Sequence, residues 1–283
     1  MTLPDSPLEQ IKQPVKQLTS LLWFERLARL GYAAKGVVYF IVGLLAAQAA
    51  IGSGGKTTNT TGALKAIVVQ PFGKFLLSIL TLGIIGYVLW RLVQTFFDPE
   101  KSQQPINAKR IAKRIGYAIS ALAYTGLALT AVKLIIGSSI GDSESIEDWT
   151  IYLLAQPFGR WLVALAGVTV ICVGIYYFYQ AYKGKFRHSF KLSQMSQTEQ
   201  NWAVGTGRFG IAARGVVFVI IGIFLMLASI QSNGRKARGL GGALTILVQQ
   251  PFGSWILGVV ASGLIAYGIY SVIQARYRHI ANL

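Results

Sequence analysis

Six long stretches without charged side chains constrain the fold of this chain more than any other feature. Five of them are 16 to 22 residues long and the sixth is longer. A transmembrane helix needs about 20 apolar residues, and fewer where Lys or Arg at its ends can reach the headgroups. The stretches lie between Lys35 and Lys56, Lys74 and Arg91, Arg114 and Lys133, Arg160 and Lys183, Arg214 and Arg235, and Arg238 and Arg276.

The stretches therefore predict six membrane-spanning helices. Buried helices of a soluble protein would show polar faces at helical period, and these segments show none. Only 13% of the residues are charged, against about a quarter in soluble domains, which excludes disorder and argues against a soluble enzyme. The predicted spans are at about 33–51, 73–94, 115–136, 158–180, 212–230 and 252–274.

Charge predicts the orientation of these spans. The side that carries both termini and the 95–114 and 181–211 loops holds twice as many Lys and Arg residues as the other side. The positive-inside bias places both termini in the cytoplasm. The N-terminus lacks a charged region followed by an apolar one, so the first span is expected to act as an uncleaved signal anchor. The net charge of +17 favours contact with a lipid bilayer that has anionic headgroups, and we expect no nucleic-acid partner.

A threefold internal repeat is the second strong signal. Each copy has an Arg-x-Gly start, and its Gly precedes a Gln-Pro-Phe-Gly tetrapeptide by 39, 40 and 40 residues. The starts carry Arg29, Arg114 and Arg208. The tetrapeptides are Gln70, Pro71, Phe72, Gly73; Gln156, Pro157, Phe158, Gly159; and Gln250, Pro251, Phe252, Gly253.

This register predicts three two-span repeats at 26–97, 111–182 and 205–277, after a cytoplasmic N-terminal segment at 1–25. Because each unit has two spans, all three units have the same orientation in the membrane. Parallel repeats of this kind are related by an axis along the membrane normal. We therefore expect an all-α membrane protein, with six transmembrane helices arranged as three parallel two-helix repeats in a pseudo-threefold manner about that normal.

The same motifs resemble a known family. The Arg-x-Gly-Tyr/Ile-Ala starts, the Gly-Val-Val-Tyr/Phe stretches at 36–39 and 215–218, and the three tetrapeptides are similar to the bacterial membrane family catalogued as domain of unknown function 1206. The resemblance covers about residues 26–277, and unit 2 departs from it at Ser120 and Ala121. It implies tandem two-span units in the plasma (inner) or another internal membrane of a bacterium, and no reaction or binding residue.

Each anchor of the repeat has a physical interpretation. Arg29, Arg114 and Arg208 are expected at the cytoplasmic interface, where a guanidinium can bind lipid phosphate. Proline biases the residue before it away from the helical region and fits the first position of a helix. A short helix at the outer surface should therefore precede each tetrapeptide, although the motif can also be only an inherited turn.

Polar residues inside the spans are the candidate binding groups. Lys35, Ser120 and Arg214 occupy equivalent positions, four residues after the Gly of each start. They can either snorkel to the interface or face a central axis as an anion or lipid site. Gln94, Gln180 and Gln274 each lie 24 residues after the first residue of the tetrapeptide. They can either line a polar ring or hydrogen-bond between helices. Lys74 and Arg91 are expected to reach outward to headgroups.

Other chemistry has little support in the sequence. One cysteine, Cys172, excludes a disulfide framework, and His188 and His279 lack other ligands at metal-binding spacing. No nucleophile, base and orienting group occur together, so we expect no enzyme and no cofactor. The acidic loop from Asp142 to Asp148 suggests ion pairing with the basic outer loops of units 1 and 3, or else a cation or partner site.

Two hypotheses for the function remain open. The first is a membrane-embedded binding or permeation module for an anionic solute or a lipid, which the symmetry-related polar residues favour. The second is a non-catalytic scaffold or accessory subunit that contacts other membrane proteins, which the lack of intramembrane acids and the Gly- and aromatic-rich spans favour.

Overall fold

The fold is helical throughout the residues that the computed structural model describes, which are 22–53, 57–96, 108–138 and 145–278. Within these ranges β-structure is limited to an isolated bridge between Phe190 and Arg278. Most of the predicted N-terminal segment (1–25), together with Asp142 and Glu144 of the acidic loop, lies outside the described residues.

Six long helices are apolar and long enough to cross a membrane, which confirms the predicted class. Short helices lie between the two long helices of each repeat, as predicted from the tetrapeptides. The long helices are α2 (Leu22–Ala50), α4 (Gly73–Phe96), α5 (Ala108–Ile135), α7 (Gly159–Lys183), α8 (Gln197–Ile230) and α10 (Gly253–Tyr277); the short ones are α3 (Thr60–Val68), α6 (Ser145–Leu154) and α9 (Leu240–Gln249).

Helix α8 begins well before the span predicted at 212–230. A capping box starts it: the Glu199 amide donates to Ser196 Oγ at 3.3 Å, and the Ser196 amide donates to Glu199 Oε2 at 2.8 Å. At a rise of about 1.5 Å per residue its 34 residues extend ~51 Å, beyond a hydrocarbon core of ~30 Å. The N-terminal part of α8 therefore projects from the membrane.

The Gln-Pro-Phe-Gly segments form three equivalent turns. In each turn the glycine amide donates to the glutamine carbonyl, at 2.8, 2.9 and 2.8 Å. Phe72, Phe158 and Phe252 adopt φ values of 59°, 63° and 59°, a left-handed conformation that costs a bulky residue free energy. The prediction that proline takes the first helical position is wrong, because this turn places proline second and the helix begins at the glycine.

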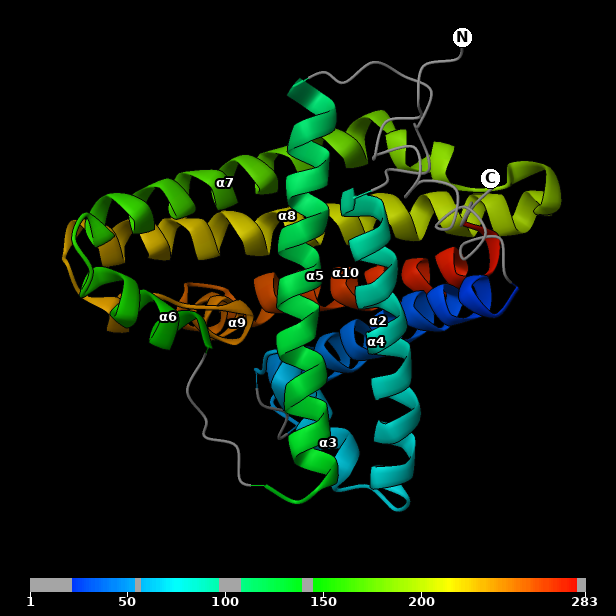
Figure 1. Ribbon diagram of the computed structural model, residues 1–283, viewed down its shortest axis with the longest axis horizontal. Helices are drawn as coiled ribbons and strands as arrows, with labels where there is room; N and C mark the ends of the chain where they lie inside the picture. Colours follow the sequence, from blue (N-terminus) through cyan, green and yellow to red (C-terminus); the bar gives the residue numbers. More distant parts are fainter. Residues whose placement is uncertain (1–21, 54–56, 97–107, 139–144, 279–283) are drawn as a thin grey trace, which may run out of the picture.

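The six long helices pack mainly as three pairs, each of which joins two different repeats. These pairs are α4–α5, α7–α8 and α10–α2, and contacts between α2 and α4 and between α8 and α10 link the pairs. A closed ring would also need α5 to pack along α7, and those two helices do not pack along their described lengths. In Figure 1, α4 and α5 run upright across the view while α7, α8 and α10 lie across it. The pseudo-threefold arrangement is therefore not confirmed.

Glycines allow the close approach of helices, both between two repeats and within one repeat. Between repeats, a Cβ on Gly36 would meet the Gly268 carbonyl, and a Cβ on Gly215 would meet the Gly174 carbonyl. Small residues of this kind let transmembrane backbones approach each other. Within repeat 2, a Cβ on Gly116 would meet nothing within 4 Å, which agrees with the open hairpin of that repeat.

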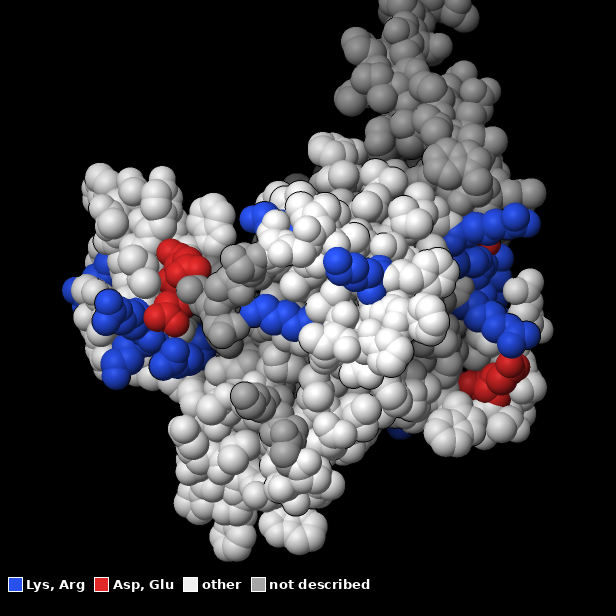
Figure 2. Space-filling view, turned by 90° about the horizontal axis from the view of Figure 1, so that it is seen from below, with Lys and Arg blue, Asp and Glu red and all other residues white. Residues whose placement is uncertain are grey.

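The surface of the bundle is that of a protein surrounded by lipid. Figure 2 shows Lys and Arg gathered mainly towards two opposite ends of the molecule, with further basic groups between them. Large apolar side chains are exposed on several of the long helices, among them Leu122 at 75%, Trp161 at 75% and Trp255 at 79%. So much exposed apolar surface would be a liability in water and is expected of a face towards acyl chains.

The turn geometry generates a stability prediction. A Cβ on Gly253 would come within van der Waals overlap of the Leu247 and Val248 carbonyl oxygens. We expect Gly253→Ala to destabilise the fold by about 2 kcal/mol, the typical cost of overpacking. Gly258→Ala in the same helix is the matched control, since its Cβ would meet only Ala50 Cβ at 4.0 Å. Thermal unfolding of both variants in detergent measures the difference. Equal unfolding midpoints would contradict the close contact that the turn places at Gly253.

Candidate functional site

Three cations lie together where α2, α4, α8 and α10 meet. We use the name cation cluster for Lys35, Arg91 and Arg214 with the two tyrosines that connect them, Tyr87 and Tyr267. Two glycines bring the tyrosines close: a Cβ on Gly31 would meet the Tyr87 backbone, and a Cβ on Gly210 would meet the Tyr267 backbone. Because these contacts are equivalent in repeats 1 and 3, the cluster is built from the repeat itself.

Lys35 is the centre of the cluster. Its side chain is only 4% exposed, and its Nζ donates to Tyr87 Oη at 3.3 Å. The same Nζ lies 5.2 Å from the Tyr87 ring centroid and 5.0 Å from that of Tyr267. Lys35 is thus held between two aromatic rings, which attract a cation through their quadrupoles.

Arg91 shares Tyr87 with Lys35. Its Nε and Nη2 donate to Tyr87 Oη at 2.8 and 2.5 Å, and its Nη1 donates to Gln94 Oε1 at 2.8 Å. Its Cζ lies 5.0 Å from the Tyr117 ring centroid. The expectation that Arg91 reaches out to headgroups is therefore wrong, because acceptors on its own helix draw the guanidinium inward.

Arg214 shares Tyr267 with Lys35. Its Nη1 donates to Tyr267 Oη at 2.5 Å, and its Cζ lies 4.5 Å from that ring centroid and 5.1 Å from those of Tyr39 and Tyr177. Its Nε is buried and has no hydrogen-bond partner in the described part of the chain. A buried guanidinium donor without an acceptor is costly, and a bound anion would remove that cost.

No carboxylate of the described residues pairs with the cluster. The ion pairs found among these residues lie at the helix ends, between Arg29 and Glu25 at 2.6 Å and between Arg238 and Glu147 at 3.6 Å. Buried charges in proteins are ordinarily paired, and tyrosine rings and hydroxyls compensate a cation only partly. The cluster therefore presents net positive charge to any anion that reaches it.

A cavity of about 610 Å³ leads to Arg214. One wall is a stripe of α8 (Arg214, Val217, Phe218, Ile221) and the opposite wall is a stripe of α5 from Leu122 to Thr130. Residues of α3, α6 and α9 line its outer part. The cavity therefore gives access to Arg214 of the cluster between α5, α8 and the short helices.

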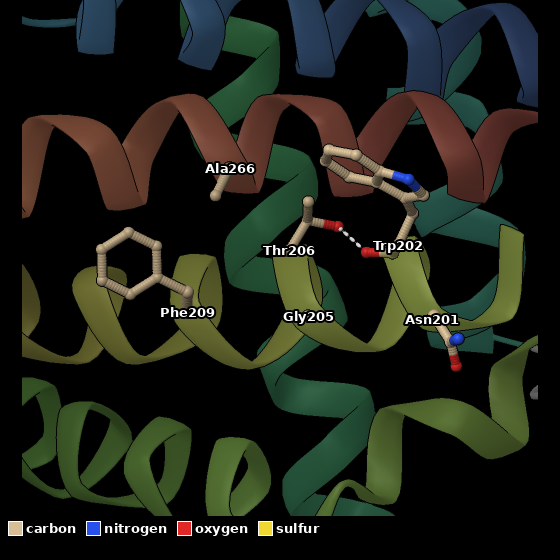
Figure 3. A pocket seen from close by; sticks show the side chains of 6 residues that line it. All are labelled: Asn201, Trp202, Gly205, Thr206, Phe209 and Ala266. Carbon is tan, nitrogen blue, oxygen red and sulfur yellow. Dashed lines mark hydrogen bonds between the residues drawn. The ribbon is translucent and has the colours of Figure 1, made fainter. Parts of the chain in front are cut away.

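A second, smaller cavity lies between α8 and α10 and is shown in Figure 3. It measures about 380 Å³ and is lined by Asn201, Trp202, Gly205, Thr206, Phe209 and Ala266. Thr206 Oγ1 donates to the Trp202 carbonyl at 2.6 Å. This lining carries no charged side chain, so it offers no comparable chemistry.

The structure brings together the three residues predicted as an anion or lipid site. Lys35 and Arg214 share Tyr267, and Ser120 lies near the Tyr87 hydroxyl. Of the three glutamines predicted as a polar ring (Gln94, Gln180 and Gln274), Gln94 accepts from Arg91, and Gln274 Nε2 donates to Tyr270 Oη at 3.0 Å. Each of these two bonds joins residues of one helix.

Sequence reasoning missed Arg91 and the two connecting tyrosines. A signal for the tyrosines was present, because Tyr87 and Tyr267 each lie 17 residues after the first residue of the tetrapeptide. Repeat 2 has Val173 at that position. Nothing in the sequence indicates the direction of Arg91, which depends on where Tyr87 points.

Two of the arginines expected to bind lipid phosphate are engaged by protein instead. Arg29 Nη1 donates to the Ala275 carbonyl at 2.7 Å and also to the Arg276 carbonyl, at the end of α10. Arg114 donates to the Thr95 carbonyl at 2.5 Å and to the Phe96 carbonyl, at the equivalent end of α4. Arg29 of repeat 1 thus caps a helix of repeat 3, and Arg114 of repeat 2 caps a helix of repeat 1. Cations in this position stabilise helix C-termini. Arg208 lies near Gly184, at the end of α7.

The comparisons with known proteins agree with the repeat. The family model described as Domain of Unknown Function (DUF1206) matches residues 30–98, 115–184 and 209–278. The chain is 36% identical over 281 residues to the "Uncharacterized protein YxxB" of Bacillus subtilis (strain 168), covering 99% of this chain and 98% of that protein. No solved structure matches the chain.

The capping arginines generate the second prediction. We expect Arg29→Lys to lower the thermal stability, because one ammonium cannot contact the two carbonyls and also make the bonds that Nε and Nη2 donate to Glu25. Loss of a hydrogen bond from a charged group typically costs about 1.5–3 kcal/mol. Arg26→Lys, at an exposed position one turn earlier, is the control and should unfold like the wild type. Unchanged unfolding of Arg29→Lys would show that the cap is not structural.

Proposed function

Because the chain belongs to the DUF1206 family, whose domain occurs three times in it, we propose that this multi-pass membrane protein is a membrane-embedded binding or permeation module for an anionic solute or a lipid headgroup. The observation that carries the proposal is the cation cluster, in which the described residues supply no carboxylate to Lys35, Arg91 or Arg214.

The position of the cluster in the membrane supports this role. Arg214 lies 16 residues before the end of α8 at Ile230, which corresponds to ~24 Å along the helix axis. If Ile230 marks the outer boundary of a hydrocarbon core of ~30 Å, Arg214 lies ~6 Å inside the opposite boundary. Ionisable residues inside the hydrocarbon region are expensive and are retained mainly for function.

The same proposal includes the orientation of the protein in the membrane. We place both termini in the cytoplasm, so that the short helices face outward and the cavity approaches Arg214 from the outer side. The proposal includes no catalytic step and no cofactor, and its partners are anionic lipid headgroups of a bacterial plasma or internal membrane.

A scaffold role is the second candidate. Helix α5 leaves part of its surface unpacked: Gly116 and Gly126 would each accept a Cβ with nothing within 4 Å. Another membrane protein could pack on such a small-residue surface. Gentle extraction from the native membrane followed by native mass spectrometry distinguishes the candidates, because a scaffold would carry a protein partner in fixed stoichiometry.

Anion binding gives the third prediction. Inorganic phosphate in detergent and phosphatidylglycerol in nanodiscs test the solute and the lipid separately. We expect at least one of them to raise the unfolding temperature of the wild type, since a ligand at 100 times its Kd stabilises by about 2.7 kcal/mol. The double variant Lys35→Gln/Arg214→Gln should lose this effect.

Lys74→Gln is the control for that experiment, because Lys74 is exposed at the start of α4. It should respond to anions like the wild type, and sodium chloride at equal ionic strength corrects for general salt effects. The proposal is contradicted if the double variant and the wild type respond equally, or if neither probe stabilises the wild type.

A further inference from the structure

The chemistry of the cavity between α5 and α8 narrows the class of ligand. Arg214 is the one charged side chain among its lining residues; Lys35 and Arg91 do not line it. Thr130 and Thr150 also line the cavity, but their hydroxyls donate to the Gly126 and Ile146 carbonyls at 2.9 and 2.6 Å. Their remaining lone pairs are acceptors, so these two hydroxyls offer an anion no donor. Arg214 is the charged donor of the lining and the strongest partner for an anion there.

The guanidinium of Arg214 has one edge free. Nη1 is used by Tyr267 Oη at 2.5 Å, whereas Nε has no partner and Nη2 makes no hydrogen bond to the residues that the structure describes. Because Nε is buried, Nη2 is the unpaired donor that a ligand in the cavity can reach. A donor on a charged guanidinium makes strong hydrogen bonds to a carboxylate.

The rest of the cavity wall is mainly apolar. Val217, Phe218 and Ile221 of α8 face Leu122 and Leu127 of α5. Each stripe runs for about two turns, or ~11 Å of helix. A small hydrated anion would leave this surface uncovered, whereas an acyl chain would bury it and gain about 25 cal/mol per Å² of apolar area.

The cavity is also open at the side. Leu122 of α5 and Trp149 of α6 line it and are nonetheless 75% and 65% exposed. A ligand dissolved in the bilayer can therefore enter from the membrane beside Leu122 of α5.

From these observations we infer that the cavity binds a single-chain amphiphilic carboxylate, such as a long-chain fatty acid, which enters from the bilayer beside α5. The carboxylate binds the unpaired Nη2 of Arg214, and the chain lies in the apolar part of the cavity between α5 and α8. This inference rests on the proposed function and specifies its ligand.

Binding of dodecanoate tests the inference, measured by native mass spectrometry and by thermal shift on the full chain. We expect one dodecanoate per protein, with affinity reduced at least tenfold by Arg214→Gln. Gly126→Leu should reduce it similarly, because Gly126 lines the cavity and its added side chain would extend into open space. Gly126→Ala is the matched small control and should bind normally.

Two competitors separate failure of the inference from failure of the proposed function. Dodecanol has the chain without the charge and should not displace dodecanoate, and neither should inorganic phosphate. If Arg214→Gln abolishes binding of phosphate or phosphatidylglycerol while Gly126→Leu leaves dodecanoate unaffected, the anion site stands and the amphiphile inference is overturned. If no anion depends on Arg214, both are overturned.

Discussion

A cation placed among apolar helices must find partners within the protein, and in this chain the partners are tyrosines. Arg91, Tyr87, Lys35, Tyr267 and Arg214 form one continuous series of hydrogen bonds and ring contacts across four helices. Rings and phenol oxygens attract the cations without neutralising them. The close glycine contacts, the burial of Lys35 and the position of Arg214 on the cavity wall all matter because this charge stays uncompensated.

The repeat explains both the cluster and its asymmetry. Repeats 1 and 3 supply the same tyrosine, and each closes its hairpin on it with an equivalent glycine, Gly31 or Gly210. Repeat 2 has Val173 in place of the tyrosine and Ser120 in place of the cation. Its two long helices do not pack on each other, and one of them, α5, lines the cavity. The copy that departs from the repeat is thus also the copy that contributes a wall of the cavity.

The architecture could be predicted from the sequence because its signals are local. The uncharged stretches predict the six spans, and the spacing of the tetrapeptide predicts the three repeats and the short helix within each of them. The direction of Arg91 and the capping by Arg29 and Arg114 could not be predicted, because they depend on acceptors that the fold brings near. The start of α8 could also have been predicted from the sequence, since Ser196 and Glu199 have the spacing of a capping box.

The stability of Lys35→Met in buffer and detergent free of added anions and lipids tests the central claim most directly. If Lys35 serves to bind an anion and lowers the stability of the fold without one, a methionine of similar shape should raise the unfolding temperature by several degrees. Replacing a buried charge by an apolar group often stabilises a protein. Lys74→Met at the exposed start of α4 should not. A clear loss of stability in Lys35→Met would instead make the cluster a structural element and contradict the account.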